Sequence, residues 1–167
     1  MFKYEGGGMA SNSGVQARTI QGNRGRITAE QIMPMINVED VHFPTSKIVS
    51  LENTSNRGGG SIYDINDIKA IRKLCDEHSM VLHLDGARVF NALVESNCSA
   101  KELGSLFHSI SICLSKGLGA PVGSLLLGTK SFIHQARRVR KVFGGGMRQA
   151  GYLAAAGQYA LDNHIER

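Results

Sequence analysis

Strand-like and helix-like segments alternate along most of this chain, and that alternation limits the possible fold more than any other feature of the sequence. Four short apolar runs are typical of strands, at 46–53, 80–87, 110–115 and 121–128. Amphipathic segments predict helices at 28–37, 64–79, 89–95, 99–109, 130–143 and 147–163. Strands joined through helices make right-handed crossovers, which align the strands in parallel. The sequence therefore predicts an α/β fold, a three-layer sandwich with helices around a mostly parallel sheet.

Capping residues place the starts of three predicted helices. Thr28 with Gln31, and Ser99 with Glu102, have the three-residue spacing of a capping box, in which side chains satisfy free backbone N–H groups. Asp64 stands where an N-cap is expected, directly before a run with helical spacing of isoleucines. These starts support the alternation of helices and strands.

Charge and length narrow the class of protein. The chain has 167 residues, 42% of them hydrophobic, which suits one globular unit with a sizeable core. Its net charge of +5 comes largely from RRVRK at 137–141 and from Arg148. The apolar residues of this segment follow helical spacing, so the cations are expected on the opposite helix face. With no Trp and four Tyr to stack on bases, we expect no nucleic-acid partner.

The cysteines and the apolar runs indicate the compartment. Cys75, Cys98 and Cys113 are odd in number and have no metal-binding or redox spacing. Cys75 and Cys113 lie within apolar patterns, so we expect reduced, buried thiols in a cytoplasmic protein. No apolar run approaches the length of a membrane span, and no pair of histidines has convincing metal-ligand spacing. We therefore expect neither a membrane partner nor a bound metal.

Chemically active residues follow three of the predicted strands. In parallel sheets the carboxyl ends of the strands meet at one edge, where ligands bind. The residues predicted at this edge are Asn53, Asn56, Asp85, Arg88, Ser115 and Lys116. Two interpretations stay open from these residues alone. They form a reactive site, or Asp85 and Arg88 form a structural ion pair while Lys116 reaches water.

Several longer strings resemble one family in the same order along the chain. These strings are KYEGGGMA, SLENTSNRGGG, HLDGARVFNA, ICLSKGLGAPVGSLLLG and RKVFGGGMRQAG. They resemble the threonine aldolases, which are pyridoxal-phosphate (PLP) enzymes of the aspartate-aminotransferase-like fold, fold type I. The resemblance implies that residues 1–167 are part of the PLP-binding large domain. It also implies an upstream segment and a small C-terminal domain outside this chain, so we expect the chain alone to be inactive.

The resemblance assigns a role to each of four residues. Lys116 matches the lysine that forms a Schiff base with PLP, and partial desolvation of its amine would favour the neutral form that this reaction needs. Asp85 matches the carboxylate that pairs with the pyridine nitrogen and keeps it protonated. Ala87 would pack on one face of the ring. Arg88 matches the arginine that holds the substrate carboxylate, for which its planar guanidinium is suited.

Other residues are secondary candidates. The resemblance places His42 near the β-hydroxyl of the substrate, where either its imidazole or a bound water would accept a proton. His83, two residues before Asp85, is expected to orient the site. Lys141 and Arg148 resemble part of a loop close to an active site, either that of their own chain or that of a neighbouring subunit. The triple-glycine runs at 6–8, 58–60 and 144–146 lack P-loop and dinucleotide-binding spacing, and we expect them to form tight loops near the cofactor.

The implied reaction is the cleavage of L-threonine or L-allo-threonine, a small β-hydroxy-α-amino acid, to glycine and acetaldehyde. The implied enzyme is a carbon–carbon lyase that works as a homo-oligomer, a dimer or tetramer. Two alternatives stay open. The chain is part of another fold type I enzyme, such as a β-eliminating lyase or an aminotransferase, or it is a non-catalytic interaction piece.

Overall fold

A four-stranded sheet forms the centre of the molecule. In the computed structural model, which describes residues 3–166, the strands are β1 (Ile48–Glu52), β2 (Val81–Gly86), β3 (Ser109–Cys113) and β4 (Ser124–Gly128). They lie in the order β1-β2-β3-β4. The first three strands run parallel, and β4 pairs antiparallel with β3. The predicted mostly parallel sheet is confirmed.

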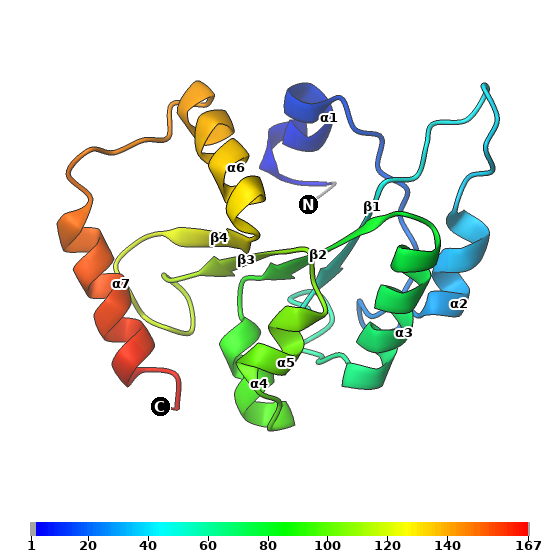
Figure 1. Cartoon of the computed structure of the whole chain (residues 1–167). Coiled ribbons are helices and arrows are strands. Elements are labelled where there is room, and N and C mark those ends of the chain that lie inside the picture. Colours follow the sequence, from blue (N-terminus) through cyan, green and yellow to red (C-terminus); the bar gives the residue numbers. More distant parts are fainter. Residues whose placement is uncertain (1–2, 167) are drawn as a thin grey trace.

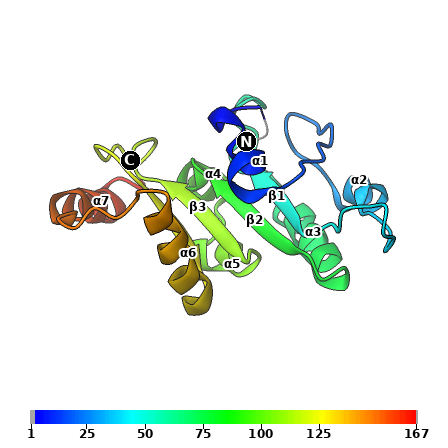
Figure 2. The same cartoon turned by 90° about the horizontal axis from the view of Figure 1, so that it is seen from above.

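Helices lie on both faces of this sheet (Figure 1). The helical elements are η1 (Glu5–Gly7), α1 (Gly8–Ser13), α2 (Ala29–Ile32), η2 (Met33–Met35), α3 (Ile65–Glu77), α4 (Val89–Ser96), α5 (Ala100–Ser105), α6 (Lys130–Val142) and α7 (Gly151–Asn163). Helices α3, α4 and α5 lie below the sheet in Figure 1, and α1 and α6 lie above it. Figure 2 shows α1 over the β1 side and α6 over the β4 side, so the upper layer is open between them.

The two predicted capping boxes differ in the structure. Thr28 and Gln31 form the complete box, with each side chain accepting a hydrogen bond from the other residue's backbone N–H. Ser99 accepts from the backbone N–H of Glu102 at 3.1 Å, but the Glu102 carboxylate instead pairs with Lys69 of α3 at 2.9 Å. Helix α5 therefore begins at the predicted residue, but it has an N-cap, Ser99, rather than a complete capping box.

The first triple-glycine run, predicted as a tight loop, forms a tight kink between two short helices. These residues form the end of η1 and the first residue of α1. Gly6 and Gly7 have φ angles of 60° and 71°, in the left-handed region that glycine adopts without a steric penalty. The other two runs are loops. Residues 58–60 follow β1, and residues 144–146 follow α6.

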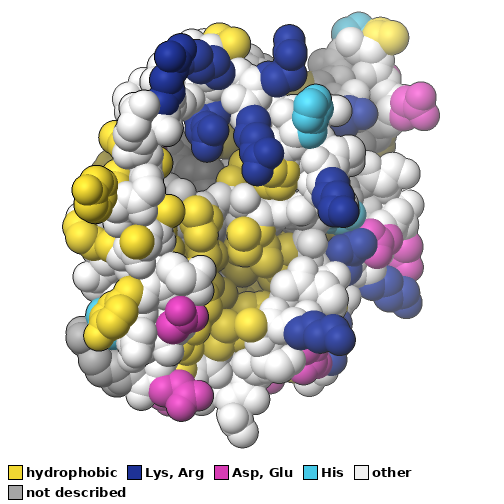
Figure 3. Space-filling model, turned by 60° about the vertical axis from the view of Figure 1, so that its left-hand side comes forward, with side chains coloured by type: hydrophobic (Ala, Val, Ile, Leu, Met, Phe, Trp, Pro, Cys, Tyr) yellow, Lys and Arg dark blue, Asp and Glu magenta, His cyan; other side chains and the backbone are white. Residues whose placement is uncertain are grey.

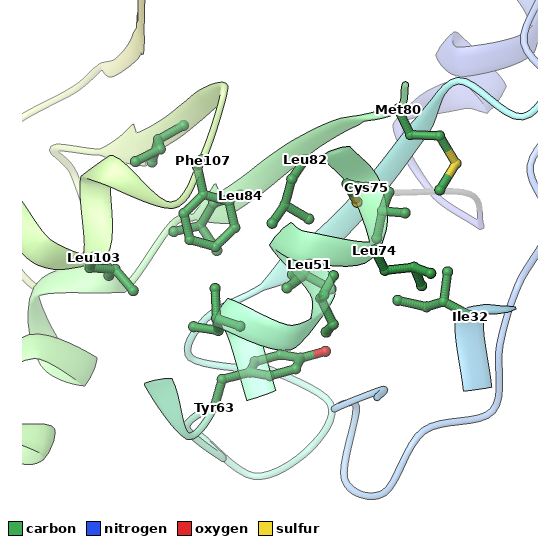
Figure 4. Packing of buried hydrophobic residues seen from close by; sticks show 14 of the residues in the cluster. Ile32, Leu51, Tyr63, Leu74, Cys75, Met80, Leu82, Leu84, Leu103 and Phe107 are labelled. Atoms are coloured by element: carbon green, nitrogen blue, oxygen red, sulfur yellow. The ribbon is translucent and has the colours of Figure 1, made fainter. Parts of the chain in front are cut away.

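The main core lies between the sheet and α3, α4 and α5 (Figure 4). Leu82 and Leu84 point from one face of β2 toward Ile71 and Cys75 of α3, and none of these four side chains is measurably exposed. Burial raises the pKa of the Cys75 thiol to about 11, so this cysteine stays protonated at neutral pH, as expected for a buried apolar residue. Cys113 differs from its prediction because it is only half-buried, on the other face of the sheet.

Replacing Leu84 with alanine is expected to lower the free energy of unfolding by about 2–5 kcal/mol, because the cavity left in a close-packed core cannot fully collapse. Urea denaturation followed by circular dichroism measures this change. The matched control is Val81→Ala, on the same strand but 41% exposed on the opposite face, with an expected change within about 0.5 kcal/mol. Equal losses in the two variants would contradict this assignment of the core.

The second face of the sheet is only partly covered toward β4. The three leucines of β4 are exposed, with Leu126 at 42%, and α6 has no buried residue. The apolar residues of α6 follow the predicted helical spacing, but Phe132 and Val139 are exposed, as are the leucines of β4. Figure 3 shows this side of the molecule, with Lys and Arg side chains gathered above a hollow lined by hydrophobic ones.

Within residues 3–166, no helix is long and apolar enough to cross a membrane.

Candidate active site

The carboxyl ends of β1, β2 and β3 meet at one edge of the sheet. Asp85, near the end of β2, lies in register with Glu52 of β1 and with Ser111 of β3. The loops that follow these three strands therefore begin side by side. Of the predicted site residues, this topology places Asp85, Ala87, Arg88 and Lys116 at the same edge, because each follows or ends a parallel strand.

Asp85 has an acceptor oxygen without a partner. Its carboxylate is half-buried, and Oδ1 accepts a hydrogen bond from the backbone N–H of Ala87 at 3.2 Å. Within residues 3–166 the carboxylate makes no other hydrogen bond and no ion pair, and neither does the guanidinium of Arg88. Asp85 and Arg88 thus do not form the structural ion pair that the sequence left open. Both charged groups remain available to a ligand.

Lys116 lies in a tight turn just beyond β3. The backbone N–H of Gly119 donates to the carbonyl of Lys116 at 2.9 Å, and Gly119 has a φ angle of 68°. A Cβ atom on Gly117 would lie 2.6 Å from Oδ1 of Asn91 in α4, closer than real side chains approach. Gly119 is therefore required by its backbone conformation, whereas a side chain at 117 would have to displace the exposed side chain of Asn91.

A small second core holds this turn in place. Leu118 is buried with Leu114, Ala120 and Ala160, the last of which belongs to α7. Nδ1 of His164, after α7, donates to the carbonyl of Leu118 at 2.7 Å. Sequence reasoning gave His164 no role, since 46 residues separate it from Leu118 and no spacing rule connects them.

The expected desolvation of Lys116 is not found in this chain, and that prediction is corrected. The side chain of Lys116 is exposed. The physical reason is local: Gly117, Gly119 and Pro121 have too little side chain to cover the amine, and the buried residues of the turn, Leu118 among them, point into the second core. The amine is accordingly accessible to an incoming aldehyde.

His83 lies on the same face of β2 as Asp85. It is half-buried, and its Nδ1 lies 2.8 Å from Oγ of Ser109, its register partner on β3. Burial lowers the pKa of His83, and the nearby negative charge of Asp85 offsets part of this effect. An imidazole held in this way is mostly neutral at pH 7, which suits the orienting role predicted for it.

The structure does not bring His42 to this edge. His42 lies in the loop that precedes β1, whereas Asp85 lies at the carboxyl end of the adjacent parallel strand. Five residues of strand separate the two edges by about 13 Å. The loop extends away from the sheet at the upper right of Figure 1, and the His42 side chain is 84% exposed.

The local partner of His42 is Asp40. One oxygen of this carboxylate, Oδ1, accepts from the backbone N–H and lies 2.8 Å from Nδ1 of His42. The hydrogen bonds from the His42 backbone and ring lower the pKa of Asp40. These contacts hold the imidazole within its own loop.

Lys141 and Arg148 make no ion pair with Asp85 within residues 3–166. Helix α6 begins after β4, whose last residue, Gly128, pairs with the first residue of β3 at the amino edge. Lys141 is in the last turn of this helix, about 16 Å along the helix axis from Lys130, and Arg148 follows in the exposed connection to α7. The predicted place of these two residues close to an active site stays a prediction.

PLP is held by its ring nitrogen, its aldehyde and its phosphate, and the residues at the carboxyl edge fit the first two of these groups. Its ring nitrogen needs an acidic partner, and Asp85 has an unpaired acceptor oxygen there. Its aldehyde needs an accessible primary amine, which Lys116 provides. Ala87, which follows Asp85 by two residues, is half-buried and presents a methyl group rather than a bulky side chain to the ring. These residues suit the ring and the aldehyde of the cofactor.

Solved structures share this fold. A putative L-allo-threonine aldolase from Listeria monocytogenes superposes with a TM-score of 0.85 at 23% identity, over 97% of this chain and 43% of that one. A putative aromatic amino acid beta-eliminating lyase/threonine aldolase from Exiguobacterium superposes with a TM-score of 0.81 at 26% identity, over 96% and 43% of the two chains. The chain thus has the α/β fold of the PLP-dependent fold type I proteins.

Sequence comparison gives the family. The beta-eliminating lyase family model matches residues 1–167, and the chain belongs to this family. The low specificity L-threonine aldolase of Escherichia coli K12 is 43% identical over 167 residues, which cover 99% of this chain and 49% of that protein. The predicted resemblance to threonine aldolases is confirmed. The chain spans about half the length of the curated relatives it matches.

Proposed function

We propose that the protein is a PLP-dependent aldolase, a carbon–carbon lyase that cleaves L-threonine or L-allo-threonine to glycine and acetaldehyde. One observation carries this proposal: Asp85, Arg88 and Lys116 are gathered at the carboxyl edge, and their charged groups make no ion pair within residues 3–166. The stability of the fold does not require three unpaired charges at this edge. A ligand with complementary groups would bind to them. The names of the curated relatives supply the class of substrate.

Each of these residues has a task that follows from its chemistry. Lys116 would hold the aldehyde carbon of PLP through Nζ, and Asp85 would keep a proton on the ring nitrogen. Arg88 would bind the substrate carboxylate with two parallel hydrogen bonds, fixing the orientation of the substrate. When bound, PLP supplies an electron sink for the pair left on Cα as the Cα–Cβ bond breaks.

The proton of the substrate hydroxyl needs an acceptor at the same edge. We propose a water molecule in this role, since His42 lies at the opposite edge and is held by Asp40. His83 would act as a positioning residue through its contact with Ser109 and its place beside Asp85. Acetaldehyde leaves after the hydroxyl loses its proton, and Cα takes up a proton to give glycine.

We further propose that the protein works in the cytoplasm as a homo-oligomer. The exposed leucines of β4 and the exposed apolar residues of α6 form a surface that association would cover. Lys141 in the last turn of α6 and Arg148 in the connection to α7 would then approach the site of a neighbouring subunit. The reduced cysteines agree with a cytoplasmic location.

Product analysis of the full-length gene product tests the proposed reaction. With PLP and L-threonine or L-allo-threonine, glycine and acetaldehyde are expected in equal amounts, at roughly 1 per second or faster. A β-eliminating lyase would instead form 2-oxobutyrate and ammonia from threonine, and an aminotransferase would require a keto-acid acceptor. Either of these outcomes, or the absence of turnover with each of the two substrates, would refute the aldolase assignment.

A further inference from the structure

The loop that follows β1 has a polar interior. We call residues 53–61 the β1 loop. Within residues 3–166 the buried polar side chains are Asn53, Thr54, Ser55 and Ser61, and all four belong to this loop. Burial of polar groups stabilises a structure only where hydrogen bonds replace those lost to water. Hydrogen bonds rather than apolar packing must therefore fix the conformation of the β1 loop.

A tight turn far away in the sequence supplies several of these bonds. Asn23 and Arg26 close this turn through two backbone hydrogen bonds, of 2.8 and 3.1 Å. Within it, Arg24 donates from Nε to the carbonyl of Gly58 at 3.0 Å, and from a terminal nitrogen to Gly59 at 3.4 Å. The hydroxyl of Ser61 donates back to the carbonyl of Arg24 at 2.6 Å. We refer to these three bonds as the Arg24 clamp.

The backbones of the turn and the loop approach closely. A Cβ atom on Gly58 would lie 1.8 Å from the carbonyl oxygen of Arg24, and one on Gly25 would lie 2.1 Å from Oγ of Ser55. Gly25 also has a φ angle of 82°, which disfavours any other residue. The sequence therefore leaves out side chains wherever the clamp needs close contact.

The β1 loop begins on the backbone of Asp85. The backbone N–H of Asn53 donates to the carbonyl of Asp85 at 3.0 Å, and its side-chain oxygen accepts from the backbone N–H of Tyr63 at 3.4 Å. The Tyr63 hydroxyl in turn accepts from the backbone N–H of Ile27, just past the turn, at 2.9 Å. One hydrogen-bonded network thus connects the turn at 23–26 to the residue at the centre of the candidate site.

We propose that Arg24 is a positioning residue for the candidate active site. By clamping the β1 loop, Arg24 fixes Asn53 and, through its backbone, the position of Asp85. This inference rests on the proposed function for its consequence in catalysis, although the clamp itself is a property of the fold. Arg24 touches neither the cofactor nor the substrate, and it acts through the loop.

Amide hydrogen exchange of the Arg24→Ala variant, measured without PLP, tests the clamp directly. Exchange at Asn53, Ser55 and Gly60 is expected to accelerate about tenfold or more, since these amides bond to Asp85 or within the loop. The amides of β3 should not change. The matched control is Arg18→Ala. Arg18 also donates to a distant backbone carbonyl, that of Met35, but this carbonyl precedes β1 and lies outside the β1 loop. Unchanged loop amides, or equal acceleration throughout the sheet, would overturn the inference.

A PLP titration of the same variants tests the consequence for the site. Arg24→Ala is expected to bind PLP about tenfold more weakly than the parent, with partial recovery when guanidinium ions occupy the vacated position. Arg18→Ala should bind as the parent does. Parent-like affinity in Arg24→Ala would overturn the positioning role alone. A parent that binds no PLP would instead refute the proposed function and the positioning role together, while the exchange experiment still decides whether the clamp exists.

Discussion

Replacing Lys116 with alanine is expected to reduce threonine cleavage by a factor of about a thousand or more. The reason is chemical rather than structural: among the candidate residues placed at the carboxyl edge, Lys116 alone has a primary amine, which is the group that forms a Schiff base with an aldehyde. In other enzymes, substitution of a single covalently acting residue lowers the rate by roughly a thousandfold to a millionfold. Steady-state assays of acetaldehyde formation by the full-length protein measure this loss.

Borohydride reduction gives an independent measurement on the same lysine. In the parent protein with PLP, reduction should leave a pyridoxyl group on the peptide that contains Lys116, and Lys116→Ala should lose this label. The control is Lys101→Ala, an exposed lysine of α5, which should keep both the label and the activity. Label on another lysine of the parent, with the Lys116 peptide unmodified, would contradict the assignment.

The stability of Lys116→Ala separates chemistry from folding. The Lys116 side chain is exposed, and the turn depends on Leu118 in the second core and on the bond from His164. Unfolding free energies of parent and variant are therefore expected to agree within about 0.5 kcal/mol. A large loss of stability would mean that the side chain has a structural role.

The alternation of segments predicted the sheet because each strand carries its own local signal. β2 has strictly alternating burial, with Leu82 and Leu84 inward, and its ends lie within one residue of the predicted range. The order of the parallel strands then follows from handedness and short connections. The pattern predicted β4 as a strand but not its antiparallel direction, because its apolar run has no alternation. It also did not predict the short helices formed by residues 5–13.

The site was predictable to the extent that it follows strand ends. Asp85, Arg88 and Lys116 were placed at one edge by the carboxyl-edge rule together with the family resemblance, and the topology brings them there. The same rule, applied to His42, gives the opposite edge, because that histidine precedes its strand. The resemblance alone suggested a role for it.

Contacts between distant segments had no signal in the sequence. Arg24 bonds to Gly58, 34 residues away, and His164 bonds to Leu118, 46 residues away. Both interactions involve backbone carbonyls, which every residue possesses, so no residue type marks the partner. Only the folded chain identifies them, and both stabilise loops that carry candidate site residues.

Replacing Asp85 with asparagine is expected to lower the rate of threonine cleavage by a factor of about a hundred or more, with little change in the fold. Asparagine keeps an oxygen that can accept from the backbone N–H of Ala87, which is the one hydrogen bond that the Asp85 side chain makes within residues 3–166. It loses the negative charge. A hydrogen bond to a charged partner contributes about 1.5–3 kcal/mol, so PLP should also bind more weakly.

The loss in rate should exceed the loss in binding, because a protonated ring nitrogen matters most when an electron pair is left on Cα. Titration with PLP and measurement of acetaldehyde formation at saturating PLP separate these two effects. The control is Asp67→Asn, an exposed carboxylate in the first turn of α3, which should leave both quantities unchanged. If Asp85→Asn binds PLP and cleaves threonine at the parent rate, Asp85 is not the partner of the ring nitrogen. A variant that binds PLP normally but loses activity would confine the role of the charge to the bond-breaking step.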